Sequence, residues 1–511
     1  MSKGLGAGCA FLRGVPELLR SRLPLTESFR PEYLEHNGVL PLEIVDQHLR
    51  VAVAGEPLVE VLDDLRMSFG APLDLIAVSH AELDEGVRSA FGAAESVVEL
   101  VRVLGDEVEG GAEPADQPVA DARDLVNQPP VIRFVNLLIR EAHDARASDI
   151  HLEATREGMR VRFRVDGVLG LVPSPPRGLQ AAVVSRVKLL AHLDIAERRV
   201  PQDGRIRARL EERELDLRVS TMPTFYGESV VLRLLDRAGR PVGLEELGMS
   251  PNDLAAFRRL AERPHGIVLA TGPTGSGKTT TLYAALGLRR TTQEKVITVE
   301  DPVEYHLDDV TQVPVNVKAG VTFGSALRSI LRQDPDVLMI GEMRDTETAL
   351  IAVQSAITGH LVFSTLHTND AVSALARLVN LGVQPYMVAA ALEAVLAQRL
   401  VRRICPECRE PYRPDPAAVA LLAHDAAGSM TLQRGRGCTR CRGTGYRGRT
   451  GIFELLRVTD DVREALSRPE AGADLRALAA GQGMTSLRED GWRAVQAGVT
   501  TIEEVLRVTQ Q

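Results

Sequence analysis

A glycine-rich segment near the middle of the chain ends in a lysine and a threonine, with the spacing G-x-x-x-x-G-K-T. Glycines allow backbone turns that a Cβ would prevent, so main-chain N–H groups can point at phosphate oxygens. We expect Lys278 to contact the β- and γ-phosphates of a nucleotide and the Thr279 hydroxyl to bind Mg²⁺. The predicted nucleotide-binding segment consists of Gly272, Pro273, Thr274, Gly275, Ser276, Gly277, Lys278, Thr279 and Thr280.

The residues on either side favour this interpretation over a glycine-rich turn that merely matches the pattern. The apolar run 266–271 contains β-branched residues and predicts a buried strand. Residues 279–286 predict a helix, whose positive N-terminal end would face the same anion. A strand, a phosphate-binding loop and a helix in this order indicate that the chain binds a nucleotide.

Acidic residues and a histidine follow three later apolar segments. Strands that alternate with helices predict a parallel sheet, whose ligands bind beyond the carboxyl ends of the strands. We therefore expect Glu304, Glu342 and His367 to converge on a γ-phosphate held by Lys278. The predicted strands before these residues are 296–299, 337–341 and 361–366.

Glu342 is predicted to position the attacking water or to hold the Mg²⁺ shell, because phosphoryl transfer needs a carboxylate at this point. The alternative role for Glu342 is to cap a helix. The residues alone do not decide which of Glu300, Asp301 and Glu304 takes part in catalysis, since one or two of them could only anchor a turn. His367 is either a sensor of the γ-phosphate or a structural histidine.

Four of the five cysteines form two C-x-x-C pairs about 30 residues apart. Paired thiolates suit a tetrahedral, structural Zn²⁺ site, whereas a disulfide or an iron–sulfur cluster is the alternative. Arginines surround both pairs, so a nucleic-acid-binding protein remains a second class of function. The predicted zinc ligands are Cys405, Cys408, Cys438 and Cys441.

Before the phosphate-binding loop, residues 121–237 predict an α+β domain with many arginines. Most of these arginines fit solvent-facing sides of strands. Arg218 and Arg233 lie in apolar strands, where a solvated position and a contact to a phosphate bound by another domain or subunit are equally compatible with the sequence. A turn at 165–168 predicts a hairpin in this domain.

The chain is long enough for three to five compact units. Its net charge of −9 argues against a dedicated nucleic-acid binder. A signal peptide is not expected, and no apolar run approaches the ~20 residues of a membrane span. The most apolar helix-like segment, 387–397, is short and contains Glu393. Cys9 has no second cysteine near it in the sequence and indicates no site.

Composition and periodicity place the domain boundaries. Residues 106–120 are acidic and rich in glycine and proline, which predicts a flexible linker. The last part of the chain predicts helices at 460–466, 475–481, 487–498 and 501–508. The predicted divisions are 1–105 for partner docking, 106–120 linker, 121–237 α+β domain, 238–245 linker, 246–397 P-loop ATPase domain, 398–445 zinc-binding subdomain and 446–511 C-terminal helical subdomain.

Together these motifs resemble the secretion-superfamily ATPases, and most of all the type II secretion ATPases of the GspE family. Type IV pilus extension ATPases are close relatives. The resemblance covers roughly residues 120–511. It rests on Gly272–Thr279, Val299–Tyr305, Leu331–Asp345 and Thr358–Asn369, which look like Walker A, Asp box, Walker B and His box, and on Ser148–His151, Arg164–Gly167, Pro201–Arg205 and Thr444–Gly451.

The resemblance implies an α/β fold with a RecA-like P-loop core, a preceding PAS-like α+β domain, a zinc-knuckle insertion, a C-terminal helical subdomain and a small N-terminal docking domain. Glu342 matches the catalytic glutamate of the family, and the four cysteines match its zinc ligands. Arg218 and Arg233 match arginines that reach a nucleotide across a domain or subunit boundary.

The resemblance also implies a cytoplasmic hexamer at the inner membrane, with ATP, Mg²⁺ and structural Zn²⁺. ATP hydrolysis would drive assembly of a pseudopilus that exports folded proteins. Residues 1–105 would bind a GspL-type inner-membrane protein, and a GspF-type platform protein would be a second partner. Membrane association would be indirect, and no nucleic acid is expected. A pilus extension ATPase would differ in partner rather than in chemistry.

Overall fold

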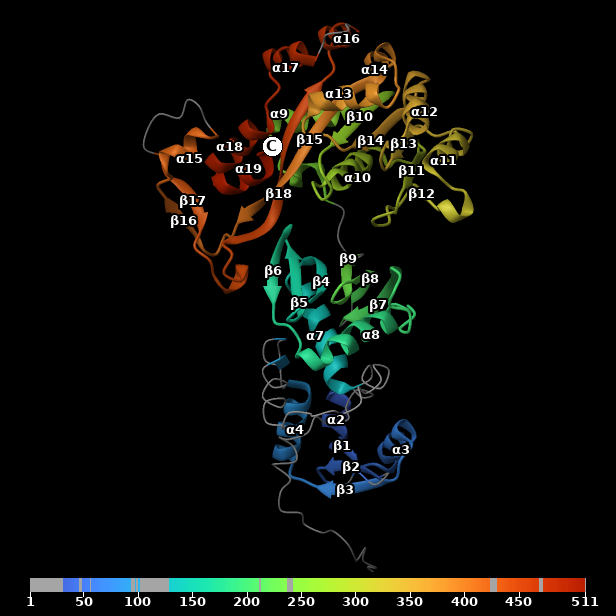
Figure 1. Cartoon of the computed structure of the whole chain (residues 1–511), viewed down its shortest axis with the longest axis vertical. Helices are drawn as coiled ribbons and strands as arrows, with labels where there is room; N and C mark the ends of the chain where they lie inside the picture. The colour runs from blue at the N-terminus through green and yellow to red at the C-terminus, as the bar shows by residue number, and fades with distance from the viewer. Residues whose placement is uncertain are drawn as a thin grey trace, which may run out of the picture. The chain divides into compact units, whose positions relative to one another are not determined.

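The computed structural model describes residues 31–45, 48–55, 57–92, 97, 100–101, 128–210, 213–236, 242–422, 430–467 and 472–510 (Figure 1). The predicted linker 106–120, Cys9 and part of the second predicted linker lie outside these residues. The chain divides near residue 235 into two compact units. Within the described residues, no helix is long and apolar enough to cross a membrane.

The first part of the first unit is a small α/β domain built on a three-stranded sheet. Its strand order is β1-β2-β3, with β1 and β2 antiparallel and β2 and β3 parallel. Leu34, Leu49 and Leu65 are fully buried in its core. The elements are α2 (Pro31–Asn37), β1 (Val39–Val45), β2 (His48–Val53), α3 (Val59–Phe69), β3 (Leu73–Ala77) and α4 (His80–Gly92).

The second part of the first unit is an α+β domain with a six-stranded sheet of order β6-β5-β4-β9-β8-β7. Helix α7 buries Phe134 and Leu138 at helical spacing. The predicted hairpin at 165–168 is confirmed as the turn between β5 and β6. The elements are α7 (Pro129–Asp144), β4 (Ala147–Thr155), β5 (Gly158–Val165), β6 (Val168–Val172), α8 (Gln180–Leu190), β7 (Gln202–Leu210), β8 (Arg213–Thr224) and β9 (Gly227–Asp236).

The second unit is organised around a seven-stranded sheet of order β12-β11-β13-β14-β10-β15-β18. Its strands are parallel except for β18, which runs antiparallel to β15. The predicted parallel sheet is therefore confirmed. The strands are β10 (Gly266–Thr271), β11 (Val296–Glu300), β12 (Thr311–Pro314), β13 (Val337–Ile340), β14 (Leu361–Leu366), β15 (Leu392–Ile404) and β18 (Tyr446–Arg457).

Helices cover both faces of this sheet (Figure 1). Along β10, Ile267 and Leu269 face the core beneath α11, α12, α13 and α14, whereas Val268 and Ala270 face α9 and α10. The strand is buried on both sides, which explains why its sequence is continuously apolar. The helices are α9 (Pro251–Ala261), α10 (Lys278–Arg289), α11 (Phe323–Ile330), α12 (Thr346–Ile357), α13 (Ala371–Asn380) and α14 (Pro385–Ala391).

The end of the predicted ATPase domain differs from expectation. The segment 387–397 is not one helix, because α14 ends at Ala391 and β15 continues from Leu392 to Ile404. Residues 446–457, expected in the helical subdomain, form β18. The four predicted C-terminal helices are confirmed as α16 (Asp460–Leu466), α17 (Gly472–Gly481), α18 (Leu487–Gln496) and α19 (Ile502–Thr509). Between β15 and β18 lie β16 (Arg409–Tyr412), α15 (Pro416–Ala420) and β17 (Leu432–Gly435).

Candidate functional site

The segments that follow four parallel strands meet at one edge of the sheet. The Gly341 N–H donates to the Val299 carbonyl at 2.8 Å, which joins the ends of β13 and β11. Thr368 N–H donates to Thr271 Oγ1 at 2.9 Å, which joins the segment after β14 to the end of β10. The parallel topology therefore gathers the residues after these strands around the glycine-rich loop.

The glycine-rich loop has the backbone that its sequence predicts. Gly272, Gly275 and Gly277 have φ of 146°, 79° and 88°, and α10 begins at Lys278. A Cβ on Gly272 would lie 2.6 Å from the Gln398 carbonyl oxygen. Such values favour glycine because a side chain would strain the backbone or collide with its surroundings.

The other residues of the loop leave polar groups that suit a phosphate. Pro273, Thr274 and Gly275 are exposed, while Thr279 and Thr280 are half-buried on the first turn of α10. Ser276 Oγ is buried and, within the described part of the chain, has no hydrogen-bond partner. The residues therefore fit a bound phosphate, which would satisfy this hydroxyl and face the N-terminus of the helix.

Lys278 is buried at the start of α10. Its Nζ donates to the carbonyls of Gly272 at 2.7 Å and Pro273 at 3.0 Å. Burial is the main cause that lowers the pKa of Lys278 to about 8; the Glu342 charge opposes this shift and the Arg399 charge adds to it. An anion beside Nζ would stabilise the charged form of this lysine.

The structure places Glu342 and His367 side by side. His367 Nε2 lies 3.5 Å from Glu342 Oε2, and Arg344 Nη2 lies 2.6 Å from Glu342 Oε1. Burial and the Lys278 charge lower the pKa of His367, although Glu342 opposes them. The Glu342 side chain is 13% exposed. Glu342 is therefore held between Arg344 and His367, near Lys278.

The three acidic residues after β11 occupy different environments. Glu300 is buried and accepts hydrogen bonds from the hydroxyls of Tyr283 and Thr298 and, at 3.2 Å, from Gln312 Nε2. Asp301 and Glu304 are exposed. Because its carboxylate is occupied by these donors, Glu300 is an anchor for the segment that carries the other two.

Two arginines near the loop were not assigned a role from the sequence. Arg344 stands two residues after Glu342, and this short spacing is a sequence signal for the contact between the two side chains. Arg399 lies on β15, far away in sequence, and its guanidinium contacts the Asn369 carbonyl. No local pattern marks Arg399, because only the pairing of β15 with β10 brings it to the loop.

Arg218 and Arg233 lie on β8 and β9 of the first unit. Arg233 Nε donates to buried Asp149 at 2.9 Å, and the Arg233 side chain is 59% exposed. Arg218 is half-buried. Both arginines belong to a different unit from Lys278, so their predicted approach to a nucleotide stays a prediction.

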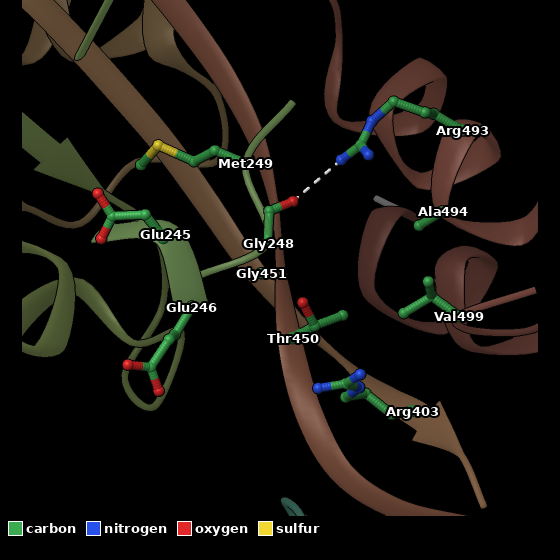
Figure 2. Close-up of a pocket in the computed structure, with 10 residues that line it drawn as sticks. All are labelled: Glu245, Glu246, Gly248, Met249, Arg403, Thr450, Gly451, Arg493, Ala494 and Val499. Carbon is green, nitrogen blue, oxygen red and sulfur yellow. Dashed lines mark hydrogen bonds between the residues drawn. The ribbon is translucent and has the colours of Figure 1, made fainter. Parts of the chain in front are cut away.

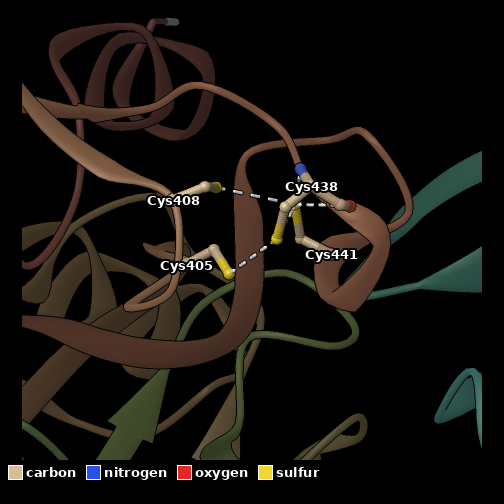
Figure 3. A group of neighbouring side chains, drawn as sticks. All are labelled: Cys405, Cys408, Cys438 and Cys441. Carbon is tan, nitrogen blue, oxygen red and sulfur yellow. Dashed lines mark hydrogen bonds between the residues drawn. The ribbon is translucent and has the colours of Figure 1, made fainter.

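The four cysteines gather at one point, as predicted (Figure 3). Their Sγ atoms all lie within 4.8 Å of one another. Three pairs are 3.7, 3.8 and 3.9 Å apart. Zn–S bonds of ~2.3 Å in a tetrahedron require S–S separations of about 3.8 Å. The cluster is therefore compatible with a tetrahedral metal ion.

Main-chain donors around the cysteines suit thiolates. Cys408 Sγ accepts from Gly437 N–H at 3.3 Å, and Cys441 Sγ accepts from Cys438 and Gly445 N–H at 3.1 and 3.2 Å. Although burial raises the pKa of Cys441, the N–H groups of Cys438 and Gly445, together with the thiols of Cys438 and Cys408, lower it to about 6. Three nearby arginines pair with acidic residues: Arg402 with Glu504, Arg434 with Glu410 and Arg440 with Glu407.

A separate pocket of about 440 Å³ lies between the segment before α9, β18 and α18 (Figure 2). Glu245, Glu246, Arg403 and Arg493 bring charges of both signs to its walls, and Arg493 Nη2 donates to the Gly248 carbonyl at 3.0 Å. It shares no lining residue with the glycine-rich loop or with the cysteine cluster. The nucleotide is therefore not assigned to this pocket.

Comparisons with known proteins agree with this geometry. The chain is 47% identical over 485 residues to type II secretion system protein E of Pseudomonas aeruginosa. The aligned region covers 94% of this chain and 95% of that protein. It is 42% identical over 480 residues to the type IV pilus assembly ATPase PilB of Myxococcus xanthus, covering 93% and 85%.

A crystal structure of the pilus retraction motor PilT with bound ADP matches with a TM-score of 0.52 and 25% identity, over 73% of this chain and 96% of that one. The MshEN domain model matches residues 14–97. The family model described as type II/IV secretion system protein matches residues 124–507. This range includes the glycine-rich loop, Glu342, His367 and the four clustered cysteines. The chain therefore belongs to the type II/IV secretion system protein family.

Proposed function

We propose that this secretion ATPase is the motor of a type II secretion system, in which ATP hydrolysis drives pseudopilus assembly and protein export. The observation that carries the proposal is the arrangement of Glu342, His367 and Lys278 at the carboxyl edge of a parallel sheet. Relatives named type II secretion system protein E, similar over almost the whole chain, support it.

The proposed reaction is in-line attack of water on the γ-phosphate. Glu342 orients the water and takes up its proton, because its carboxylate is fixed by Arg344 and His367. Lys278 and the N–H groups of the loop stabilise charge on the phosphate. Thr279 would hold Mg²⁺, which would neutralise charge on the phosphates. Glu304, exposed after β11, is assigned a supporting role at the γ-phosphate.

We assign Arg218 and Arg233 to a nucleotide bound by another subunit of a homo-hexamer. The exposure of Arg233, whose Nε is held by Asp149, supports this role because an exposed guanidinium is accessible to a group on another subunit. An arginine supplied from outside a P-loop site stabilises transition-state charge. Loss of turnover with retained assembly in an Arg233→Gln variant would support the assignment.

We assign structural Zn²⁺ to Cys405, Cys408, Cys438 and Cys441. The separations of the sulfurs and their main-chain donors support zinc rather than a disulfide or an iron–sulfur cluster. Such a site contributes folding energy to the segment around it. Metal analysis of the purified chain, with a Cys408→Ser variant as the control, tests this assignment.

We place the protein at the cytoplasmic face of the inner membrane, held by partners. Residues 1–105 bind a GspL-type inner-membrane protein, and a GspF-type platform protein is the second partner. The compact α/β domain at residues 31–92 supports the docking role, because it has its own core. Nucleic acid is not a partner, so DNA or RNA should leave hydrolysis unchanged.

Two measurements test the function. The full chain should hydrolyse ATP, and Glu342→Gln should abolish turnover while ATP binding is retained. Glu347→Gln is the matched control, because Glu347 is an exposed acid on α12 that pairs with Arg328. Unchanged turnover in Glu342→Gln would refute the assigned role of this carboxylate.

The second measurement captures inner-membrane proteins of the source cell with the full chain and with a chain lacking residues 1–105. Recovery of a secretion-system membrane protein by the full chain alone supports the type II function. Type IV pilus extension is the second candidate, favoured by the similarity to PilB. Recovery of a pilus platform protein instead would move the chain to that function with the same chemistry.

A further inference from the structure

Two consecutive residues of β15 support the phosphate-binding loop. β15 runs parallel to β10, with Ala397 beside Thr271, the last residue before the loop. Gln398 Oε1 accepts a hydrogen bond from Thr281 Oγ1 on α10 at 2.8 Å. A Cβ on Gly277 would lie 2.8 Å from Gln398 Nε2, and one on Gly272 would lie 3.0 Å from Arg399 Nη1. The loop glycines thus allow these two side chains to approach.

Arg399 lies against Gly272 of the loop and hydrogen-bonds the segment after His367. Its Nη2 donates to the Asn369 carbonyl at 2.9 Å, and its Nη1 donates to the Gln398 carbonyl at 3.1 Å. The residue is 8% exposed. Asn369 stands two residues after His367, whose imidazole contacts Glu342. The guanidinium therefore lies between the loop that carries Lys278 and the segment that carries His367.

The charge of Arg399 faces two buried acids. Burial lowers the pKa of Arg399, and the charges of Glu454 and Asp370 oppose this shift. Asp370 accepts from the Ser373 N–H at 2.8 Å, at the start of α13, and pairs with Arg476 of α17 at 3.0 Å. Asp370 thus connects the start of α13 to the C-terminal helix α17.

We propose that Arg399 is a positioning residue for ATP hydrolysis, which fixes the phosphate-binding loop and the His367 segment in one mutual arrangement. The proposal rests on the proposed function of this site. The planar guanidinium reaches two carbonyls with separate nitrogens, whereas a lysine ammonium is a single point on a flexible chain. A positive charge alone, as in Arg399→Lys, should therefore not restore the positioning by the Arg399 guanidinium.

The test uses the full chain and measures kcat, KM and the affinity for a fluorescent ATP analogue. We expect kcat about 100-fold lower in Arg399→Gln and about tenfold lower in Arg399→Lys, because a displacement near 1 Å has effects of this size. Nucleotide affinity should stay within about threefold, since the loop contacts remain. Amide hydrogen exchange at 366–372 should be faster in both variants.

Arg463→Gln is the matched control, because Arg463 is a partly buried arginine of the same unit that contacts Glu393 and the Ala389 carbonyl away from the loop. It should keep kcat within about twofold of the unaltered chain. Should Arg399→Gln not fold, Arg399→Lys, which keeps the buried charge, gives the same comparison.

Three outcomes would overturn the proposal: kcat within twofold in both Arg399 variants, an equal loss in Arg463→Gln, or exchange at 366–372 that does not change. Failure of the proposed function is a separate result, namely that the unaltered chain does not hydrolyse ATP or that Glu342→Gln keeps turnover. The hydrogen-exchange measurement does not depend on turnover, so it tests the positioning role of Arg399 even if the chain does not hydrolyse ATP.

Discussion

Replacing Glu504 by glutamine should loosen the C-terminal region from the long β15–β18 strand pair. Glu504 lies on α19 with its side chain 2% exposed. Its carboxylate accepts hydrogen bonds from Arg402 Nη2 and main-chain N–H at 2.7 and 3.0 Å, and from Arg507 Nε and Nη2 at 2.9 and 2.7 Å. Arg402 in turn lies over the Tyr446 ring, 4.1 Å from its centroid. One carboxylate therefore joins α19, β15 and β18.

The magnitude follows from the pKa of this carboxyl. Burial raises it, but the hydrogen bonds from Arg507 and Arg402 prevail and lower the pKa from 4.5 to about 2. At ~1.4 kcal/mol for each pH unit, this difference corresponds to about 3 kcal/mol. Arg507 is 43% exposed, so water screens part of the interaction, and we expect a loss of about 2 kcal/mol in Glu504→Gln.

The effect has a defined pH dependence. Because the folded-state pKa lies below the unfolded value, the contribution is complete above about pH 6 and is lost as the pH falls through 4.5 toward 2. The stability difference between the unaltered chain and Glu504→Gln should therefore shrink to roughly half at pH 3.5.

The single tryptophan, Trp492, lies on α18 beside α19, so urea unfolding followed by its fluorescence reports on this region. Glu503→Gln is the matched control, because Glu503 is the exposed neighbour on the same helix. Its change should stay within about 0.5 kcal/mol. Equal losses in the two variants at pH 7, or a Glu504→Gln deficit unchanged at pH 3.5, would refute the reasoning.

Three further predictions concern the two sites. Glu342→Gln should keep ATP binding and abolish hydrolysis, measured as bound nucleotide and released phosphate; turnover equal to that of Glu347→Gln would contradict it. Chelation should unfold the segment around 405–441 and leave nucleotide affinity unchanged, whereas retained protease resistance after confirmed metal loss would count against this. Tyr283→Phe removes a donor to buried Glu300 and should lower stability by about 1–3 kcal/mol with ATP affinity retained; unaltered thermal stability would show that this hydroxyl is not needed.

Features that are local in the chain could be predicted from the sequence. The turns of the phosphate-binding loop depend on glycines within eight residues, and the strand and helix beside it depend on neighbouring residues. The C-x-x-C pairs indicate a metal because both ligands of each pair are close in sequence. The order of strands and helices also predicted the parallel sheet, which places Glu342 and His367 at the same edge as Lys278.

The segment 392–397 is a strand that local sequence patterns do not predict. Its apolar residues are buried on both faces of a central strand, so they show no period of two and resemble a buried helix. Without this strand pairing, nothing in the sequence places Gln398 and Arg399 beside the loop. The burial of Glu300 likewise depends on Tyr283 of α10 and on Gln312 of β12, which no spacing connects.

The sequence by itself determined which residue types are available for chemistry: a nucleotide-type loop, a carboxylate and a histidine at strand ends, and four cysteines that suit a metal. Only the tertiary structure decided which acid is an anchor, which arginine lies against the loop and how the C-terminal helices join the sheet. The physical reason is that hydrogen bonds and ion pairs act over a few ångströms, between groups whose separation in the chain carries no signal until strands pair and helices pack.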